Sequence, residues 1–310
     1  MEQALLKVNF EQLIDGQNCL VACYMYILNS LEKEWSYLFS ALWKLEPTKR
    51  GILDYVLHEK LGLIEKKSVV STDHYIEMVE YELKHNRHII VEVDLYYCPW
   101  SMSYMEAHEI HDCILKKVYL EEEKYYCIDK IVGNGEFFWE STLFMKALQR
   151  TYIYESVEKA AHMSCGEVLR NLKDNFPNGS KDIVEMFELL KYHVLEVNSL
   201  HVLFEEIESG SCIAILMLKQ FQMVRLGISY LLFNLYRENP IIEDLYVIAL
   251  DFYKSQELFK KMSAFLYKLY YTDRYDNDAY IKLETCLTTI KELELHIFER
   301  ICSIIQLHNW

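Results

Sequence analysis

The 310-residue sequence lacks a long apolar run, a cluster of basic residues and a fixed internal repeat. Its longest uninterrupted apolar run covers residues 212–218, whereas a helix that spans a membrane takes about 20 residues. Lysine and arginine do not gather beyond pairs, and the formal net charge is -15. No basic leader followed by an apolar stretch opens the sequence. We therefore expect a cytoplasmic protein that has neither a membrane nor a nucleic acid as its partner.

The sequence also lacks the cysteine pattern of a disulfide scaffold or a metal site. Nine cysteines occur at irregular spacings, and an odd number does not pair completely. Cys19 and Cys23 have the i, i+4 spacing of metal ligands, but no second pair accompanies them. The segment from His108 to His111 is one residue shorter than the His-Glu-x-x-His pattern of zinc proteases. We therefore expect reduced cysteines, no metal and no cofactor.

Residues 1–157 mix helical and strand-like periods, which predicts an α+β domain whose helices precede an antiparallel sheet. The apolar fraction of 52% is sufficient for a core in each of two domains. Helices are expected over residues 19–31, 34–45, 51–61, 72–85 and 140–148. Strands are expected over residues 88–95, 113–120, 124–131, 135–139 and 151–154, with a turn at 132–135.

Residues 158–310 show helical periods only, which predicts an all-α bundle domain. Helices are expected over residues 180–197, 211–237, 240–273 and 278–307, with breaks at 175–180, at Asn239-Pro240 and at 275–278. The sequence leaves two roles open for this domain. It either closes over a substrate pocket or mediates self-association into a homodimer.

Cys19 stands where the loop Asp15-Gly16-Gln17-Asn18 meets a strongly apolar helix. A helix N-terminus presents unpaired N–H groups and the positive end of the helix dipole, and both stabilise a thiolate. This position predicts a nucleophile with a lowered pKa. The alternative is a cysteine of the hydrophobic core, as we expect for Cys23 one turn later.

His111 and Asp129 are the partners that the sequence offers to such a thiol. His111 precedes a strand-like run and Asp129 ends the next one, where a carboxylate can orient an imidazole. A solvated loop for His111 and an ordinary strand-end turn for Asp129 are the competing interpretations. Gln12 and Gln17, together with the N–H of Cys19, are candidate donors for an oxyanion, and spacing does not choose between the two glutamines.

Residues 10–155 resemble the N-terminal domain family of butirosin biosynthesis protein H, which is itself related to papain-fold peptidases that remove double-glycine leaders. The resemblance is carried by residues 17–23 (Gln-Asn-Cys-Leu-Val-Ala-Cys), residues 94–100 (Asp-Leu-Tyr-Tyr-Cys-Pro-Trp), Tyr104 with His108 and His111, and residues 126–129 (Tyr-Cys-Ile-Asp). Leu20 and Leu13 stand where the leader peptidases have a glycine and a glutamine. These departures disfavour a leader peptidase and leave the oxyanion hole undefined.

The resemblance implies a papain-like domain that transfers an acyl or aminoacyl group from a carrier-protein thioester to an amine during natural-product assembly. Cys19 would be the nucleophile, His111 the base and acid, and Asp129 the orienting carboxylate. An acyl or peptidyl carrier protein and a small-molecule amine are then the partners. The acyl pocket would be lined by Tyr97, Trp100, Tyr104 and His108. The competing interpretation of the aromatic segment 96–100 is an ordinary packed loop.

Two other functions remain open at this stage. A cysteine peptidase or amidase would use the same three residues, with water in place of the amine. A non-catalytic relative would keep the fold and bind a partner through its helical domain.

Overall fold

The computed structural model describes residues 2–14, 17–44, 50–70, 74–130, 135–158, 162–196, 213–272 and 277–310. The chain divides into two compact units that interleave along the sequence. The sheet unit contains Ile14–Trp35 and Asp54–His162, and the helical unit contains Met1–Leu13, Ser36–Leu53 and Met163–Trp310. The sequence predicts two contiguous domains with one boundary between residues 157 and 158, and that boundary stays a prediction.

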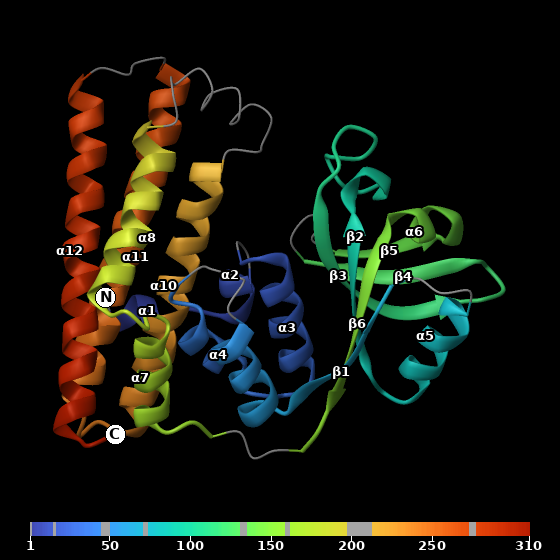
Figure 1. The fold of residues 1–310 in the computed structure, drawn as a ribbon, viewed down its shortest axis with the longest axis horizontal. Coiled ribbons are helices and arrows are strands. Elements are labelled where there is room, and N and C mark those ends of the chain that lie inside the picture. Colours follow the sequence, from blue (N-terminus) through green and yellow to red (C-terminus); the bar gives the residue numbers. More distant parts are fainter. Residues whose placement is uncertain are drawn as a thin grey trace. The chain divides into compact units, whose positions relative to one another are not determined.

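The sheet unit is built on one antiparallel sheet of six strands in the order β1-β6-β2-β3-β4-β5 (Figure 1). Its elements are α3 (Cys19–Ser30), η2 (Val56–Lys60), β1 (Leu63–Val69), α5 (Tyr75–Lys84), β2 (His88–Asp94), η3 (Leu95–Tyr97), β3 (Ile110–Tyr119), β4 (Lys124–Asp129), β5 (Gly135–Glu140), α6 (Ser141–Ala147) and β6 (Leu148–Ser156). The central strands β2, β3 and β4 are rich in β-branched, aromatic and other apolar residues, which is typical of buried strands.

One face of this sheet forms the hydrophobic core with α5 and α6. Alternate residues of β3, among them Cys113 and Leu115, point into this core with Val93 of β2 and Phe144 of α6. Each of these four side chains is at most 1% exposed. The register of the central strands is therefore fixed by apolar burial.

The opposite face of the sheet packs against α3. Asn18 caps this helix by accepting a hydrogen bond from the N–H of Leu20 at 2.9 Å, as an N-cap side chain does. The hydroxyl groups of Tyr24 and Tyr154 are hydrogen bonded at 2.8 Å, which ties α3 to β6. α3 packs against β3 and begins at Cys19, so the thiol lies at the N-terminal end of this helix.

In its described part, the helical unit has three long helices and several short ones (Figure 1). Its elements are α1 (Glu2–Leu5), α2 (Phe10–Ile14), η1 (Trp35–Ala41), α4 (Arg50–Tyr55), α7 (Cys165–Asp174), α8 (Ser180–Lys191), η4 (Tyr192–Glu196), α10 (Ile213–Glu238), α11 (Glu243–Thr272) and α12 (Asn277–Leu307). A few terminal residues of α2, η1 and α4 belong to the sheet unit. Searching the described residues reveals no helix with both the length and the apolar character that crossing a membrane demands.

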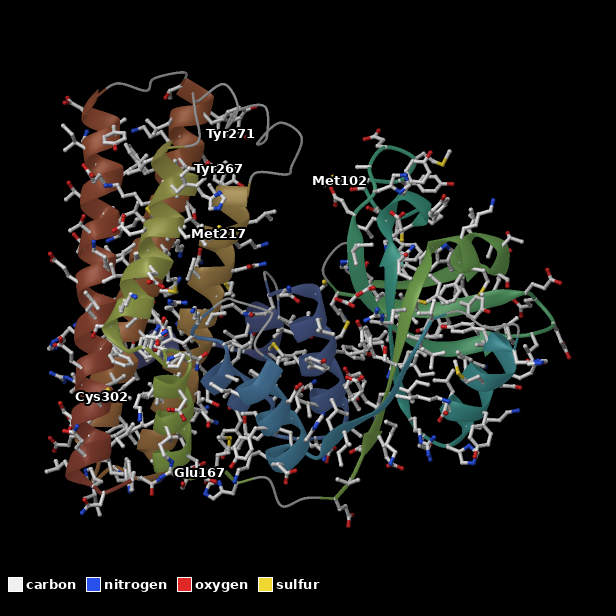
Figure 2. The ribbon with its side chains drawn as sticks, in the orientation of Figure 1. Met102, Glu167, Met217, Tyr267, Tyr271 and Cys302 are labelled. Carbon is white, nitrogen blue, oxygen red and sulfur yellow. The ribbon has the colours of Figure 1, made fainter. Side chains whose placement is uncertain are left out.

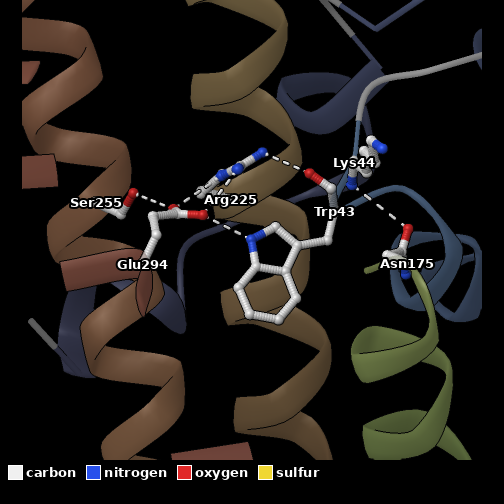
Figure 3. A network of polar contacts seen from close by, with 6 residues as sticks. All are labelled: Trp43, Lys44, Asn175, Arg225, Ser255 and Glu294. Atoms are coloured by element: carbon white, nitrogen blue, oxygen red, sulfur yellow. Dashed lines mark hydrogen bonds and ion pairs between the residues drawn. The ribbon is translucent and has the colours of Figure 1, made fainter. Parts of the chain in front are cut away.

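A fully buried polar network holds the long helices together (Figure 3). Arg225 of α10 donates to both carboxylate oxygens of Glu294 on α12, at 3.0 and 2.8 Å. The same carboxylate accepts from Ser255 of α11 and from the indole of Trp43, both at 2.6 Å. Because every charged atom has a partner, this pair is tolerated in an apolar interior.

The α+β class predicted from the sequence is confirmed by the antiparallel sheet and the helical C-terminal region. Most predicted elements are present, with shifted ends. The prediction that the first four helices precede every strand is wrong, because β1 lies before α5. The segment predicted as a helix over 34–45 contains a 3₁₀ helix, η1, and the helix α7 was not predicted. Residues 132–134 of the predicted turn, the loop residues 15–16 and the ends of predicted helices at 197 and 211 fall outside the described residues.

Candidate functional site

Cys19 is hydrogen bonded to a carboxylate, not to an imidazole. Its thiol donates to Oδ2 of Asp112 at 3.2 Å, which joins the first residue of α3 to β3. Cys23, one turn later, is buried, and its thiol donates to the main-chain oxygen of Asp112 at 3.6 Å. Both thiols of α3 thus lie against the same residue of the sheet.

The pKa of Cys19 is raised to about 12. Burial is the largest cause, and the charge of Asp112 and its hydrogen bond to the thiol add to it, because all three disfavour the thiolate. The N–H of Leu20 acts in the opposite direction and is outweighed. The expectation that the helix N-terminus lowers this pKa is therefore wrong, and the resting state is a neutral thiol.

The thiol borders a small pocket between α3 and the sheet, whose free volume of about 10 Å³ is roughly the room that one water molecule needs. Cys19 and Asp112 lie in its wall, and Lys130 brings a positive charge to it. The remaining lining residues are apolar or aromatic, namely Ala22, Cys23, Tyr26, Ile114 and Ile128. The pocket therefore brings a proton donor, a proton acceptor and an ammonium group together.

His111 and Asp129 are brought together, as the sequence predicts for two members of a triad. His111 Nε2 lies 3.1 Å from Asp129 Oδ2, and both residues are at most 5% exposed. The indole of Trp100 donates to the same oxygen at 3.0 Å. These two atoms are close enough for an ion pair, but their alignment is not that of a good hydrogen bond.

His111 points away from Cys19 because consecutive side chains of a strand alternate between its two faces. Asp112 faces α3, so His111 faces the core side, where its cross-strand neighbour Val93 also points. The hydrogen bonds of the described residues include none between Cys19 and His111. The structure thus brings together two of the three predicted residues, His111 and Asp129, and Asp112 lies beside the thiol instead.

The two candidate oxyanion donors lie in different compact units. Gln17, two residues before Cys19, is buried in the sheet unit and is 5% exposed. Gln12 is exposed on α2 in the helical unit, where its N–H donates to Asn9. Gln17 is therefore the glutamine that shares a unit with the thiol, and the role of either as a donor stays a prediction.

The residues predicted to line the acyl pocket lie on or beside the loop between β2 and β3, not in the wall of the pocket at Cys19. Tyr97 packs against the core, and Tyr104 is half-buried. The exposed His108 donates from Nδ1 to Asp94 Oδ2 at 2.6 Å and stacks on Tyr96. Met102, labelled in Figure 2, is 88% exposed on this loop.

Asp112 is the site residue that the sequence reasoning left out. It belongs to the same acidic and imidazole-rich segment as His111, and only the alternation of β3 decides which of the two meets α3. No group of three or more histidine, cysteine or carboxylate side chains that would hold a metal occurs among the described residues. The described cysteines are all free thiols.

A comparison of the chain with protein-family models and with curated proteins finds no match in either. The resemblance to the butirosin family, its papain-like fold and its transferase activity therefore stay proposals.

Proposed function

We propose that this protein is a thiol-dependent acyltransferase in which Cys19 carries the acyl group and Asp112 holds the proton of the thiol. The observation that carries this proposal is the 3.2 Å hydrogen bond from the thiol to the carboxylate at a pocket open to solvent. A thioester is the substrate that suits a neutral thiol, because its carbonyl is already activated. The donor is an acyl or peptidyl carrier protein in the cytoplasm, and the acceptor is a small-molecule amine.

In the first step the Cys19 sulfur attacks the thioester carbonyl while its proton moves to Asp112 Oδ2. Attack makes the S–H group strongly acidic, so a carboxylate suffices as the base although the resting thiol has a pKa of about 12. The C–S bond of the donor then breaks, and the proton passes from Asp112 to the departing thiolate. The product of this step is acyl-Cys19 and a free carrier thiol.

In the second step the amine attacks the carbonyl of acyl-Cys19. The amine loses one proton to Asp112, and the bond between the carbonyl carbon and the Cys19 sulfur breaks. Asp112 returns the proton to this sulfur, which restores the neutral thiol and releases the amide. His111 and Asp129 do not exchange protons with the substrate in this scheme, because they face the other side of β3.

The proposal is tested by incubating the protein with a short acyl-pantetheine thioester at pH 7.5 and measuring the intact mass after a rapid acid quench. We expect one acyl adduct, located on Cys19 by peptide mapping and absent in Cys19→Ser. Cys302→Ser is the matched control, because it removes a partly exposed thiol of α12, labelled in Figure 2, and should keep the adduct. An adduct that persists in Cys19→Ser, or no adduct at all, would refute the proposal.

Two further measurements separate the alternatives. Adding an amine to the isolated acyl-enzyme should give an amide faster than water gives the acid, whereas release by water alone would make the protein a hydrolase. His111→Gln should form the adduct at a rate within about threefold of the unchanged protein. A loss of 100-fold or more in this variant, with normal folding by circular dichroism, would return the role of base to His111.

A further inference from the structure

The pocket beside Cys19 is small and its wall is largely apolar. Its free volume of about 10 Å³ is roughly the room that one water molecule needs. Ala22 of α3, Ile114 of β3 and Ile128 of β4 line it, and each of these side chains is at most 3% exposed. Side chains packed at this density resist displacement by a larger occupant. The pocket therefore admits one non-hydrogen atom together with its hydrogen atoms.

The charged groups of the wall favour a neutral occupant that donates a hydrogen bond. Asp112 contributes a carboxylate and Lys130 an ammonium group, so the formal charges of the wall cancel. Asp112 Oδ2 accepts the hydrogen bond of the Cys19 thiol at 3.2 Å, and a carboxylate has acceptor sites for further donors. An O–H or N–H group in the pocket would therefore find a hydrogen-bond acceptor within reach.

The pocket also borders the sulfur that would carry the acyl group. Cys19 lines the pocket, and in acyl-Cys19 the carbonyl carbon is bonded directly to that sulfur. A nucleophile must approach this carbon to about 3–3.5 Å while a base accepts its proton. An atom in the pocket lies beside the sulfur of Cys19 and beside the carboxylate of Asp112. This is the arrangement from which an acyl group is attacked.

We propose that this pocket is the nucleophile site of the second step, in which Ala22, Ile114 and Ile128 limit the nucleophile to one non-hydrogen atom with its hydrogen atoms. The acceptor that fits is a primary amine on an unbranched carbon, with its nitrogen in the pocket and the rest of the molecule outside. A secondary amine, or an amine on a branched carbon, would force a further carbon against the wall. This choice of acceptor rests on the proposed function, whereas a site for one small hydrogen-bond donor does not.

The covalent step at this site exchanges one bond to the carbonyl carbon for another. The neutral nitrogen forms a bond to this carbon, and the bond from the carbon to the Cys19 sulfur breaks. One proton passes from the nitrogen through Asp112 to the sulfur, which leaves a neutral thiol and an amide. Water fits the same room and reacts by the same route, so we expect slow hydrolysis of acyl-Cys19 when no amine is present.

Four amines that differ little in basicity test this selection by size. Methylamine and dimethylamine differ by one carbon on the nitrogen, and ethylamine and isopropylamine differ by one carbon next to it. Each amine is added to the acetyl-Cys19 protein, and the loss of the acetyl group is followed by intact mass. Each rate is divided by the rate of the same amine with free acetyl-pantetheine. We expect the less substituted amine of each pair to react at least about tenfold faster after this correction, because one carbon is forced into a packed wall.

Ile114→Val should relax this selection, because it removes one carbon from the wall of the pocket. The preference for methylamine over dimethylamine should then fall to about threefold or less. Ile90→Val is the matched control, because Ile90 pairs with Ile114 across β2 and β3, is also buried and does not line the pocket. It should keep the tenfold preference. Equal corrected rates in the unchanged protein, or the same change in both valine variants, would overturn the nucleophile site.

A crystal structure of the unchanged protein tests the site without catalysis. We expect one water in the pocket, hydrogen bonded to Asp112, and no water there in Ala22→Val, because two added methyl groups would fill the space. If the water is found but thioesters give no adduct on Cys19, the site stands and the transferase falls. If the adduct forms but the amines react without selection by size, the nucleophile site falls and the transferase stands. A dry pocket in the unchanged protein would overturn the site, and release of the acetyl group by water alone would overturn the amine as its occupant.

Discussion

Replacing Asp112 by asparagine should change two rates at Cys19 in opposite directions. The carboxylate disfavours the thiolate through its charge and its hydrogen bond, so its loss should lower the pKa of the thiol and speed alkylation. The same carboxylate accepts the proton during attack on a thioester, so its loss should slow acylation. An ordinary core cysteine beside a surface carboxylate would show the first effect only.

The size of the first effect follows from the raised pKa. A pKa of about 12 in place of 9.0 is a difference of about 3 units, which lowers the thiolate fraction at pH 8 by roughly 1000-fold. A more basic thiolate is also a stronger nucleophile, with a Brønsted coefficient near 0.5, so the rate falls by only about 30-fold. Burial is the largest cause and remains in the variant, so Asp112→Asn should accelerate alkylation by roughly threefold to tenfold.

The second effect is larger. Removing a general base costs about 100-fold to 10,000-fold, which exceeds the gain in thiolate and leaves acylation at least tenfold slower. Iodoacetamide labelling of Cys19 and quenched acylation by a pantetheine thioester measure the two rates on the same sample. Glu92→Gln is the matched control, because Glu92 pairs with Asp112 across β2 and β3 on the same face and is not bonded to the thiol. If Asp112→Asn accelerates both reactions, the carboxylate only lowers the reactivity of the thiol, and the proposal that it acts as the base is wrong.

Three further predictions concern the stability of each unit. Glu294→Leu leaves the buried guanidinium of Arg225 without its carboxylate, so we expect a loss of about 3–5 kcal/mol in urea unfolding that Arg225→Met in the same chain largely restores; an unchanged midpoint in the single variant would contradict this. Gly227→Ala would place a methyl group against the ring of Phe39, closer than van der Waals contact allows, so the melting temperature should fall and should recover when Phe39→Leu is added. A melting temperature as high as that of the original chain would disprove the close contact. His88 has a folded pKa of about 4 against 6.5 in a model peptide, so its contribution to stability is complete above pH 6.5 and is lost as the pH falls towards 4; an NMR titration midpoint near 6.5 would contradict the burial and the cationic neighbours that cause it.

The sequence predicted the central strands well because their composition is distinctive. β2 and β4 are rich in β-branched, aromatic and other apolar residues, which are typical of buried strands. β1 was missed because it is an edge strand whose middle residues Glu65, Lys66 and Lys67 are charged, and both lysines are exposed. Charged residues are common on edge strands because they hinder pairing with other chains. Composition alone therefore did not distinguish β1 from a loop.

The site was predicted only in part, for a physical reason. The pairing of His111 with Asp129 follows from two neighbouring antiparallel strands, which the sequence shows. The sequence does not show on which face of the sheet His111 lies, because helices cover both faces of the central sheet. Such a strand has no polar side, so its composition does not reveal which alternate residues meet α3.

The register of β3 decides which residue serves Cys19, and that register is costly to change. A slip by one residue would turn His111 towards α3, but it would also turn Asp112 and Lys116 into the core now occupied by Cys113 and Leu115. Burying two unpaired charges disfavours that arrangement by several kcal/mol. His111 would therefore reach the thiol only if the first residues of β3 left β2, and that opening would expose the ladder hydrogen bonds around Val93 to solvent. Hydrogen exchange of these amides during turnover distinguishes the two residues. Slow exchange would support Asp112 as the group beside the thiol, whereas fast exchange that depends on the thioester would favour His111.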